Sequence, residues 1–320
     1  MHIFDAVFQS VAALLAIGVL GFWIVKRNII PENILSFLST LAIDIALPSI
    51  VFANIVLKFN PSALPDWWQL PVWWLLFAAA SLALTMILMF ISARDTRREF
   101  AISLFFQNGI FFPLIVMTGV FGSETPFIAQ LFIFIIFHPT LYFSTYHLFF
   151  RHGSGRSTAH SHIRWQRIVN PVLIATLIAV AVRLTGADGY LPAFVIRVFQ
   201  MLGDMTLPLL MLILGGSLYV DFQKKGRFYF LEMAKFVVTK NVLFPLVFLG
   251  LLMLVRPDYN IALLIMLESA VPPITGIPIV TEREGGNRSI TNQFILASFV
   301  FSIITIPLVF LIFNRVFVMP

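Results

Sequence analysis

The chain has 320 residues, of which 59% are hydrophobic and only 11% are charged, and its mean hydropathy is +0.95. This composition excludes a soluble globular domain and predicts an all-α polytopic membrane protein in a lipid bilayer. The absence of cysteine excludes disulfides and thiol chemistry, and no Gly-rich phosphate loop indicates ATP-driven pumping. The net charge of +6 is read as a topology signal, and no nucleic-acid partner is expected.

Ten apolar segments are long enough to cross a hydrocarbon core of about 30 Å as helices. The longest polar connection divides the chain into a five-span unit at 1–150, a cytoplasmic linker at 151–167 and a second five-span unit at 168–320. With five spans in each unit, the second must run opposite to the first. The predicted spans are residues 5–25, 33–57, 72–93, 100–121, 126–150, 168–186, 192–219, 228–255, 260–281 and 290–315.

Basic residues in the connections predict the orientation. Fourteen Lys and Arg residues fall on one side of the spans and five on the other, while Lys235 and Lys240 lie within the eighth span. The positive-inside tendency assigns the larger set to the cytoplasm. We therefore expect a multi-pass protein of the cell's inner (plasma) membrane with both termini on the non-cytoplasmic side. Four tryptophans at the outer end of the third span are expected to anchor it at the interface: Trp67, Trp68, Trp73 and Trp74.

A short motif occurs in both halves of the chain. Asp44 and Asp204 each begin the pattern Asp-x-x-Leu-Pro, in the second and the seventh span, at an offset of 160 residues. The same offset pairs Asn108 with Glu268 and Pro113 with Pro273. These matches indicate an inverted repeat, and shared helix-end chemistry is the alternative. Both aspartates precede a proline by four residues, so they are either coupling-ion ligands or hydrogen-bond partners of loosened backbone.

Two polar, helix-breaking islands interrupt apolar spans, at residues 107–113 of the fourth span and 267–278 of the ninth. Prolines remove backbone donors, and freed backbone groups are tolerated at membrane depth only where protein or a watery cavity surrounds them. We expect the two breaks to meet near the midplane and to bind a carboxylate or another anion, although a kinked packing helix is the alternative. The predicted substrate-binding residues are Asn108, Gly109, Pro113, Pro272, Pro273, Thr275 and Gly276.

Glu268 lies beside the second break, where a negative charge would repel an anion. Burial favours the protonated carboxyl group, which makes Glu268 a candidate proton-coupling group. Binding a cation and pairing with Lys240 are the alternatives. Lys240 and Asn241 begin the pattern Lys-Asn-x-x-x-Pro in the eighth span, so an ammonium within a membrane helix needs a partner. No cofactor is expected, apart from a proton or sodium as coupling ion.

With these motifs the chain resembles the auxin efflux carrier family of membrane transporters, including bacterial members of the malate and malonate permease type. The resemblance covers essentially the whole chain and depends on the order of several short motifs. They are Asp44–Pro48, Asn108-Gly109 with Gly119 and Gly122, Leu207-Pro208 with Gly215–Leu218, Lys240–Pro245 and Ala270–Gly276. The family's fourth helix often has Gly-x-Pro where this chain has Phe111-Phe112-Pro113, which leaves the position of the first break open.

The resemblance implies ten transmembrane helices in two inverted five-helix repeats, with crossed, broken helices 4 and 9, as in bile-acid and sodium/proton antiporter-like folds. It further implies a scaffold of helices 1, 2, 6 and 7 with a homodimer contact, and a transport domain of helices 3–5 and 8–10. Asn108 and the break at Pro272-Pro273 would lie at the substrate site.

These observations favour a secondary or potential-driven transporter of a small organic anion over an enzyme. The alternatives are a sodium- or proton-coupled symporter of a larger amphipathic acid and a membrane sensor that keeps the fold without transport. A channel is disfavoured because only two polar islands occur, at similar depth. A membrane enzyme is disfavoured because the histidines and carboxylates do not converge in the sequence.

Overall fold

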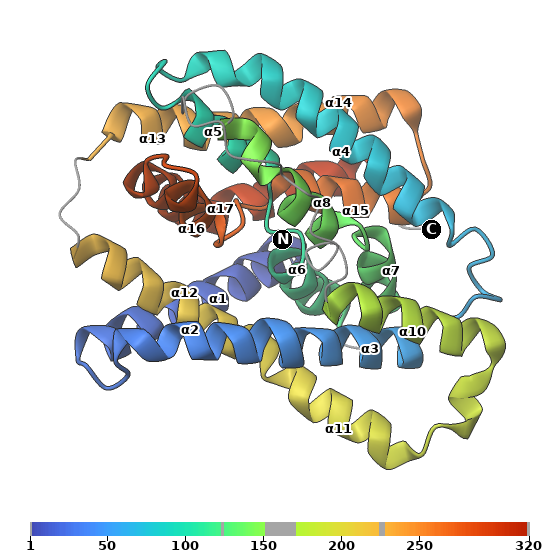
Figure 1. The fold of residues 1–320 in the computed structure, drawn as a ribbon. Helices are drawn as coiled ribbons and strands as arrows, with labels where there is room; N and C mark the ends of the chain where they lie inside the picture. The colour runs from blue at the N-terminus through green and yellow to red at the C-terminus, as the bar shows by residue number, and fades with distance from the viewer. Residues whose placement is uncertain (1, 123–124, 151–170, 224–227, 319–320) are drawn as a thin grey trace.

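The fold is described from a computed structural model, for residues 2–122, 125–150, 171–223 and 228–318 (Figure 1). The predicted linker at 151–167 lies outside the described residues. Helices of the first half are α1 (His2–Lys26), α2 (Glu32–Leu41), η1 (Ala42–Ala46), α3 (Leu47–Lys58), α4 (Gln69–Leu88), η2 (Met89–Ile91), α5 (Arg97–Phe105), α6 (Phe111–Phe121), α7 (Phe127–Phe134), α8 (His138–Thr145) and η3 (Tyr146–Phe150). Those of the second half are α10 (Pro171–Thr185), η4 (Ala187–Tyr190), α11 (Ala193–Asp204), α12 (Thr206–Gln223), α13 (Phe230–Val237), η5 (Val238–Leu243), α14 (Phe244–Val255), α15 (Tyr259–Ala270), α16 (Ile277–Arg283) and α17 (Arg288–Val316).

Seven helical segments in the described part of the chain are long and apolar enough to cross a membrane, which confirms a polytopic membrane protein. They are Phe4–Lys26, Glu32–Lys58, Gln69–Ile91, Phe127–Phe150, Ala193–Val220, Phe230–Val255 and Arg288–Val316. The other three predicted spans contain shorter apolar helices, α6, α10 and α15. Two of these belong to the interrupted spans, so the count of ten spans and the inverted repeat stay predictions.

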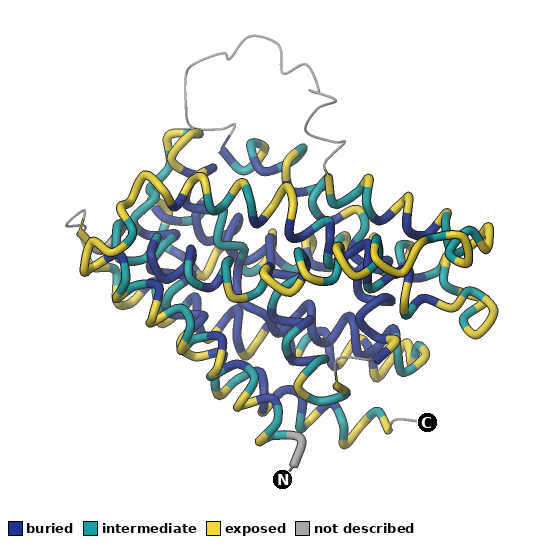
Figure 2. Tube along the Cα trace, turned by 90° about the horizontal axis from the view of Figure 1, so that it is seen from below, coloured by how far each residue is buried: buried dark blue, intermediate teal, exposed yellow. Residues whose placement is uncertain are grey.

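Large apolar side chains cover the outside of the molecule. The outward faces of the helices are exposed and the centre is buried (Figure 2). Leu254, Phe230 and Phe37 are among many large hydrophobic residues whose side chains are exposed on helices. Such an outer surface suits lipid, in which apolar side chains lose nothing by exposure.

Helices α1, α2, α3, α10, α11 and α12 pack together in the lower part of Figure 1. The most extensive contact joins α1 to α12, where no side chain separates the two backbones. A Cβ atom on Gly215 would overlap the carbonyl oxygen of Gly18, and one on Gly21 would overlap the backbone of Leu212. Small residues therefore permit the close approach that holds membrane helices together without a hydrophobic driving force.

Prolines explain the two π-helical turns. Pro48 and Pro245 each lack a backbone N–H and crowd the carbonyl group four residues earlier, which belongs to Asp44 and Asn241. The helix widens there, at η1 and η5, and then continues as α3 and α14. These prolines therefore alter a turn without breaking the span.

The fourth and ninth predicted spans, in contrast, are broken. Helix α5 ends at Phe105 and α6 begins at Phe111, while α15 ends at Ala270 and α16 begins at Ile277. The first break therefore precedes the Phe-Phe-Pro sequence, which opens α6. These bounds correspond at a separation of 165–166 residues, so the predicted pairing of Pro113 with Pro273 at 160 is wrong for the breaks themselves.

Candidate functional site

The two broken segments hydrogen-bond to each other through their backbones. Asn108 N donates to the carbonyl oxygen of Pro272 at 2.8 Å, and Ile274 N donates to that of Phe106 at 3.0 Å. Gln107 and Pro273 form an isolated antiparallel bridge between these bonds. Each break thus supplies partners that the other lost at its helix end, which is how irregular backbone is tolerated inside a membrane protein.

Asn108 occupies the bend of the first break with its side chain buried. Its Oδ1 accepts a hydrogen bond from Phe111 N at 3.4 Å and so caps the start of α6. Its Nδ2 is buried and has no hydrogen-bond partner among the described residues. Because an unpaired buried donor is costly, this amide is suited to a ligand with an acceptor oxygen.

Glu268 lies in the last turn of α15 with no exposed surface. Its carboxyl group lies against the backbone of Gly109, where a Cβ atom would overlap both carboxyl oxygens. Neither oxygen makes a well-formed hydrogen bond with a described residue, although the side chain of Gln107 faces the group. The structure thus brings Asn108-Gly109 and Glu268 into one buried cluster.

Lys240 is also fully buried, in η5, and its charge acts on Glu268. Its Nζ donates to the carbonyl oxygen of Ser269 at 3.4 Å and lies 4.5 Å from the centre of the Phe244 ring. The Ser269 carbonyl is free because the residue four positions later, Pro273, has no N–H. The predicted partner of Lys240 is therefore a backbone carbonyl and an aromatic face, next to the second break.

Asn241 serves as a support. Its Nδ2 donates to the backbone oxygen of Ser298 at 2.9 Å, and its Oδ1 accepts from the Ser298 hydroxyl at 2.7 Å. A further bond at 3.3 Å joins Nδ2 to Thr305 Oγ1. These bonds connect η5 to α17 across buried surface and fix the turn from which Lys240 extends.

The remaining predicted residues of the breaks have different positions. Pro113, Pro272 and Pro273 are buried, and Pro113 lies in the first turn of α6 rather than in the break. Thr275 and Gly276 are half-buried just before α16. A Cβ atom on Gly276 would lie 3.2 Å from the hydroxyl of Tyr142, a buried group without a partner among the described residues.

Asp44 and Asp204 do not join this cluster. Asp44 lies in η1 and Asp204 at the end of α11, and both are exposed on the outside of the molecule. No hydrogen bond or ion pair links either to a described residue, so they do not secure loosened backbone within this structure.

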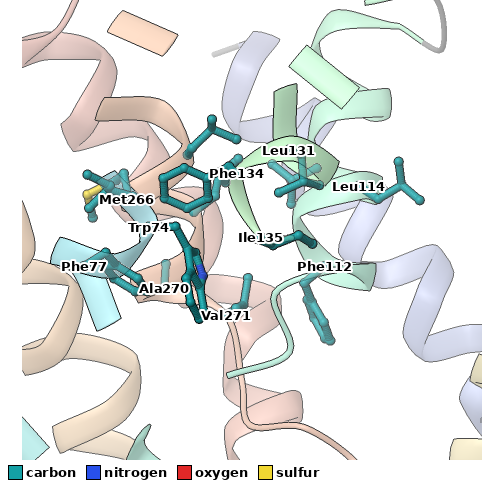
Figure 3. Close-up of a cluster of buried hydrophobic side chains, with 14 of the residues drawn as sticks. Trp74, Phe77, Phe112, Leu114, Leu131, Phe134, Ile135, Met266, Ala270 and Val271 are labelled. Carbon is teal, nitrogen blue, oxygen red and sulfur yellow. The ribbon is translucent and has the colours of Figure 1, made fainter. Parts of the chain in front are cut away.

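Apolar side chains enclose the second break. Trp74, Phe77 and Met266 gather around Ala270 and Val271 (Figure 3). Trp74 is only 1% exposed, so the prediction that it anchors the third span at the interface is wrong, while Trp68 is 57% exposed. Closure of the cluster by bulky rings keeps water away and strengthens the electrostatic interactions inside it.

Several participants were absent from the predicted site. Gln107 was part of the polar island but was not proposed as a site residue, although its neighbour was. The Ser269 carbonyl and the Phe244 ring could be found by counting four residues back from Pro273 and four onward from Lys240. Tyr142, Trp74 and His138 had no local signal, because only tertiary packing brings them here; the Trp74 and His138 rings lie 5.8 Å apart.

Removing one member of the buried charge pair should destabilise the protein unequally. Lys240→Met leaves an ionised Glu268 without a counter-charge, and we expect a loss of roughly 3–5 kcal/mol in the free energy of unfolding. Glu268→Gln should cost less, since Lys240 keeps the Ser269 carbonyl and the Phe244 ring. Adding Glu268→Gln to Lys240→Met should recover part of the loss, measured by unfolding in detergent; strictly additive losses would contradict the pairing.

Gly109→Ala should displace the Glu268 carboxyl group. Overpacking of this kind costs roughly 1–3 kcal/mol of unfolding free energy. Gly250→Ala is the matched control, because a Cβ atom there meets nothing within 4 Å. In the variant with Glu268→Ala added, the clash should vanish, and a thermal-unfolding series of the four proteins tests this. An equal effect of both glycine substitutions would argue against the close approach.

Comparison with protein families agrees with this arrangement of broken apolar helices. A family model described as membrane transport protein matches residues 6–310, almost the whole chain. No curated protein matches the sequence. The match confirms the resemblance seen in the ordered motifs around Asp44, Asn108, Lys240 and Ala270–Gly276. The chain therefore belongs to the membrane transport protein family, that of the auxin efflux carriers.

Proposed function

We propose that this membrane transporter is a secondary transporter that carries a small organic carboxylate by alternating access. The observation that carries the proposal is the buried crossing of two broken segments, at which the Asn108 amide is unpaired and Lys240 supplies a positive charge. An amide donor and a nearby ammonium are the groups that recognise a carboxylate.

Burial of the crossing supports a carrier over a channel. Gln107 and Asn108 are each 3% exposed and Glu268 is not exposed at all. A conducting pore requires a continuous polar pathway, whereas a carrier holds its site closed between the two openings. The contact of Phe112 with Phe299, 4.8 Å between ring centres, occupies the space beside the first break and favours a small substrate.

The proposed moving parts follow the packing of the helices. In the proposal, α1, α2–α3, α10 and α11–α12 form the scaffold, and the other helices, including both broken spans, form the transport domain. The contacts of α1 with α6 and α17 and of α3 with α7 would then be the sliding surface. The excess of basic residues on one side supports an inner-membrane orientation with both termini outside the cytoplasm.

A ligand screen followed by flux measurement tests the proposed function. Purified protein should gain thermal stability from a small carboxylate among dicarboxylates, indole acids and bile acids, and in liposomes should show saturable counterflow of it. Asn108→Asp keeps the capping oxygen but replaces the donor with a negative charge, so affinity should fall at least about tenfold.

The exposed Asn33→Asp is the control and should leave affinity unchanged. Stabilisation without flux would instead support a sensor, and flux linear in concentration would support a channel. If no carboxylate stabilises the protein or is carried, the proposal fails.

We further propose a homodimer formed through the scaffold. Asp44 and Asp204 lie near the middle of the spans Glu32–Lys58 and Ala193–Val220, and both are exposed. The turn that bears Asp44 packs against α11 and α12. A bare carboxylate facing lipid at this depth is costly, which supports a second copy that covers this face.

Native mass spectrometry of lipid-embedded protein should therefore show a dimer. Asp44→Arg should shift it to monomer through like charges brought together on the two copies. Asp66→Arg, at an exposed loop position, should not. A wild-type protein that is monomeric at every concentration would exclude this contact.

A further inference from the structure

Glu268 differs from the other buried carboxylates of the described residues. Glu99 accepts a hydrogen bond from Asn287 N at 2.8 Å, and Glu232 accepts from Ser92 Oγ at 2.8 Å and from Lys235 at 2.7 Å. Glu268 is more deeply buried and has no well-formed hydrogen bond. An ionised carboxylate in this state depends on a nearby cation.

Lys240 is that cation, and it is the only Lys or Arg among the buried side chains that the structure describes. It does not form a closed ion pair with Glu268, since no nitrogen–oxygen contact within 4.0 Å joins them. Its ammonium is directed to the Ser269 carbonyl and the Phe244 ring instead. An ammonium held by a neutral carbonyl and a ring is free to exchange one carboxylate for another.

The charge of the cluster limits which states are stable in the interior. Without substrate, an ionised Glu268 and Lys240 sum to zero. A substrate carboxylate added to this pair leaves one unbalanced negative charge, whereas the same carboxylate beside a protonated Glu268 leaves none. Unbalanced charge in a low-dielectric interior is strongly disfavoured, so the empty ionised state and the loaded protonated state are the favoured ones.

We propose that Glu268 and the substrate carboxylate alternate as the counter-charge of Lys240, so that each carboxylate enters the site together with one proton. This inference rests on the proposed function. The proton comes from water on the side where substrate enters and forms an O–H bond on the Glu268 carboxyl group. Lys240 stays protonated throughout. On the other side the anion leaves, the proton returns to water, and the Glu268 carboxylate again balances Lys240 for the return.

Few other titratable groups face Glu268. The elements packed against α15 are α4, α6, α7, α14, α17 and η5, and their only charged side chain in the described interior is Lys240. On α8, His138 lies against Trp74 and Tyr142 lies near Gly276, both buried. Glu99 on α5 is engaged by Asn287 N. None of these balances the ammonium in place of Glu268.

Proton-driven accumulation tests the inference in liposomes that contain the full chain, with malonate as the probe and the membrane potential held at zero. An inward gradient of one pH unit should accumulate malonate about tenfold in the wild type. Glu268→Gln imitates the protonated carboxyl group, so it should retain malonate–malonate exchange but lose accumulation. The exposed Glu32→Gln should retain both.

Infrared difference spectroscopy of the purified, substrate-free protein is the second measurement. Lys240→Met should show the band of a protonated carboxyl group that wild type lacks at neutral pH and that the double variant with Glu268→Gln also lacks. Should Lys240→Met fail to fold, acidification of the wild type should raise the same band, and Glu268→Gln should not show it.

Wild-type exchange without dependence on the pH gradient would overturn the proton coupling and leave the carrier function standing. Absence of wild-type exchange, with no carboxylate stabilising the protein, would be a failure of the proposed function instead. In that case the infrared band alone decides whether Lys240 holds Glu268 ionised, and its absence from both preparations overturns the inference.

Discussion

Loss and recovery of backbone hydrogen bonds at the crossing determine the rest of the structure. Pro272 and Pro273 remove two donors from the end of α15, and Pro113 removes one from the start of α6. The segments left over cannot face lipid, where an unpaired peptide group costs several kcal/mol. They pair with each other through Asn108 N and Ile274 N, which requires that the two spans cross at their breaks.

The same deficit places the charges. Because Pro273 frees the carbonyl of Ser269, a strong donor is needed beside the second break, and Lys240 supplies it. An ammonium in the interior in turn needs a negative group, and Glu268, one residue before Ser269, is the nearest acid in the chain. Gly109 lets that carboxyl group reach the first break. The polar cluster is therefore a consequence of three prolines in two spans, with each charge following from the previous need.

How much of this could be predicted from sequence depends on whether the cause is local. The membrane class, the interrupted fourth and ninth spans and the residues Asn108, Gly109 and Glu268 follow from hydropathy and proline chemistry, which are local. The pairing of Pro113 with Pro273 was wrong because residues can be inserted between spans without changing the fold. Burial of Trp74 was missed because the face of α4 that meets α15 is fixed by tertiary packing.

Polar links away from the crossing bear on how a transport domain would move. Glu232 on α13 binds Ser92 and Thr96 before α5, Glu99 on α5 binds the backbone before α17, and Asn241 binds Ser298 within α17. All of these join elements that the proposal assigns to the transport domain. Glycines, in contrast, line contacts of α1, where Gly119 of α6 meets Ser10.

A body fastened internally by buried hydrogen bonds, and resting on its neighbour through small apolar residues, can slide without breaking the bonds that shape its site. Under the proposed mechanism, Asn108, Lys240 and Glu268 would keep their mutual geometry during the movement. Access to water would then change around a fixed cluster, and the protonation of Glu268 would be set by whichever side the cluster faces.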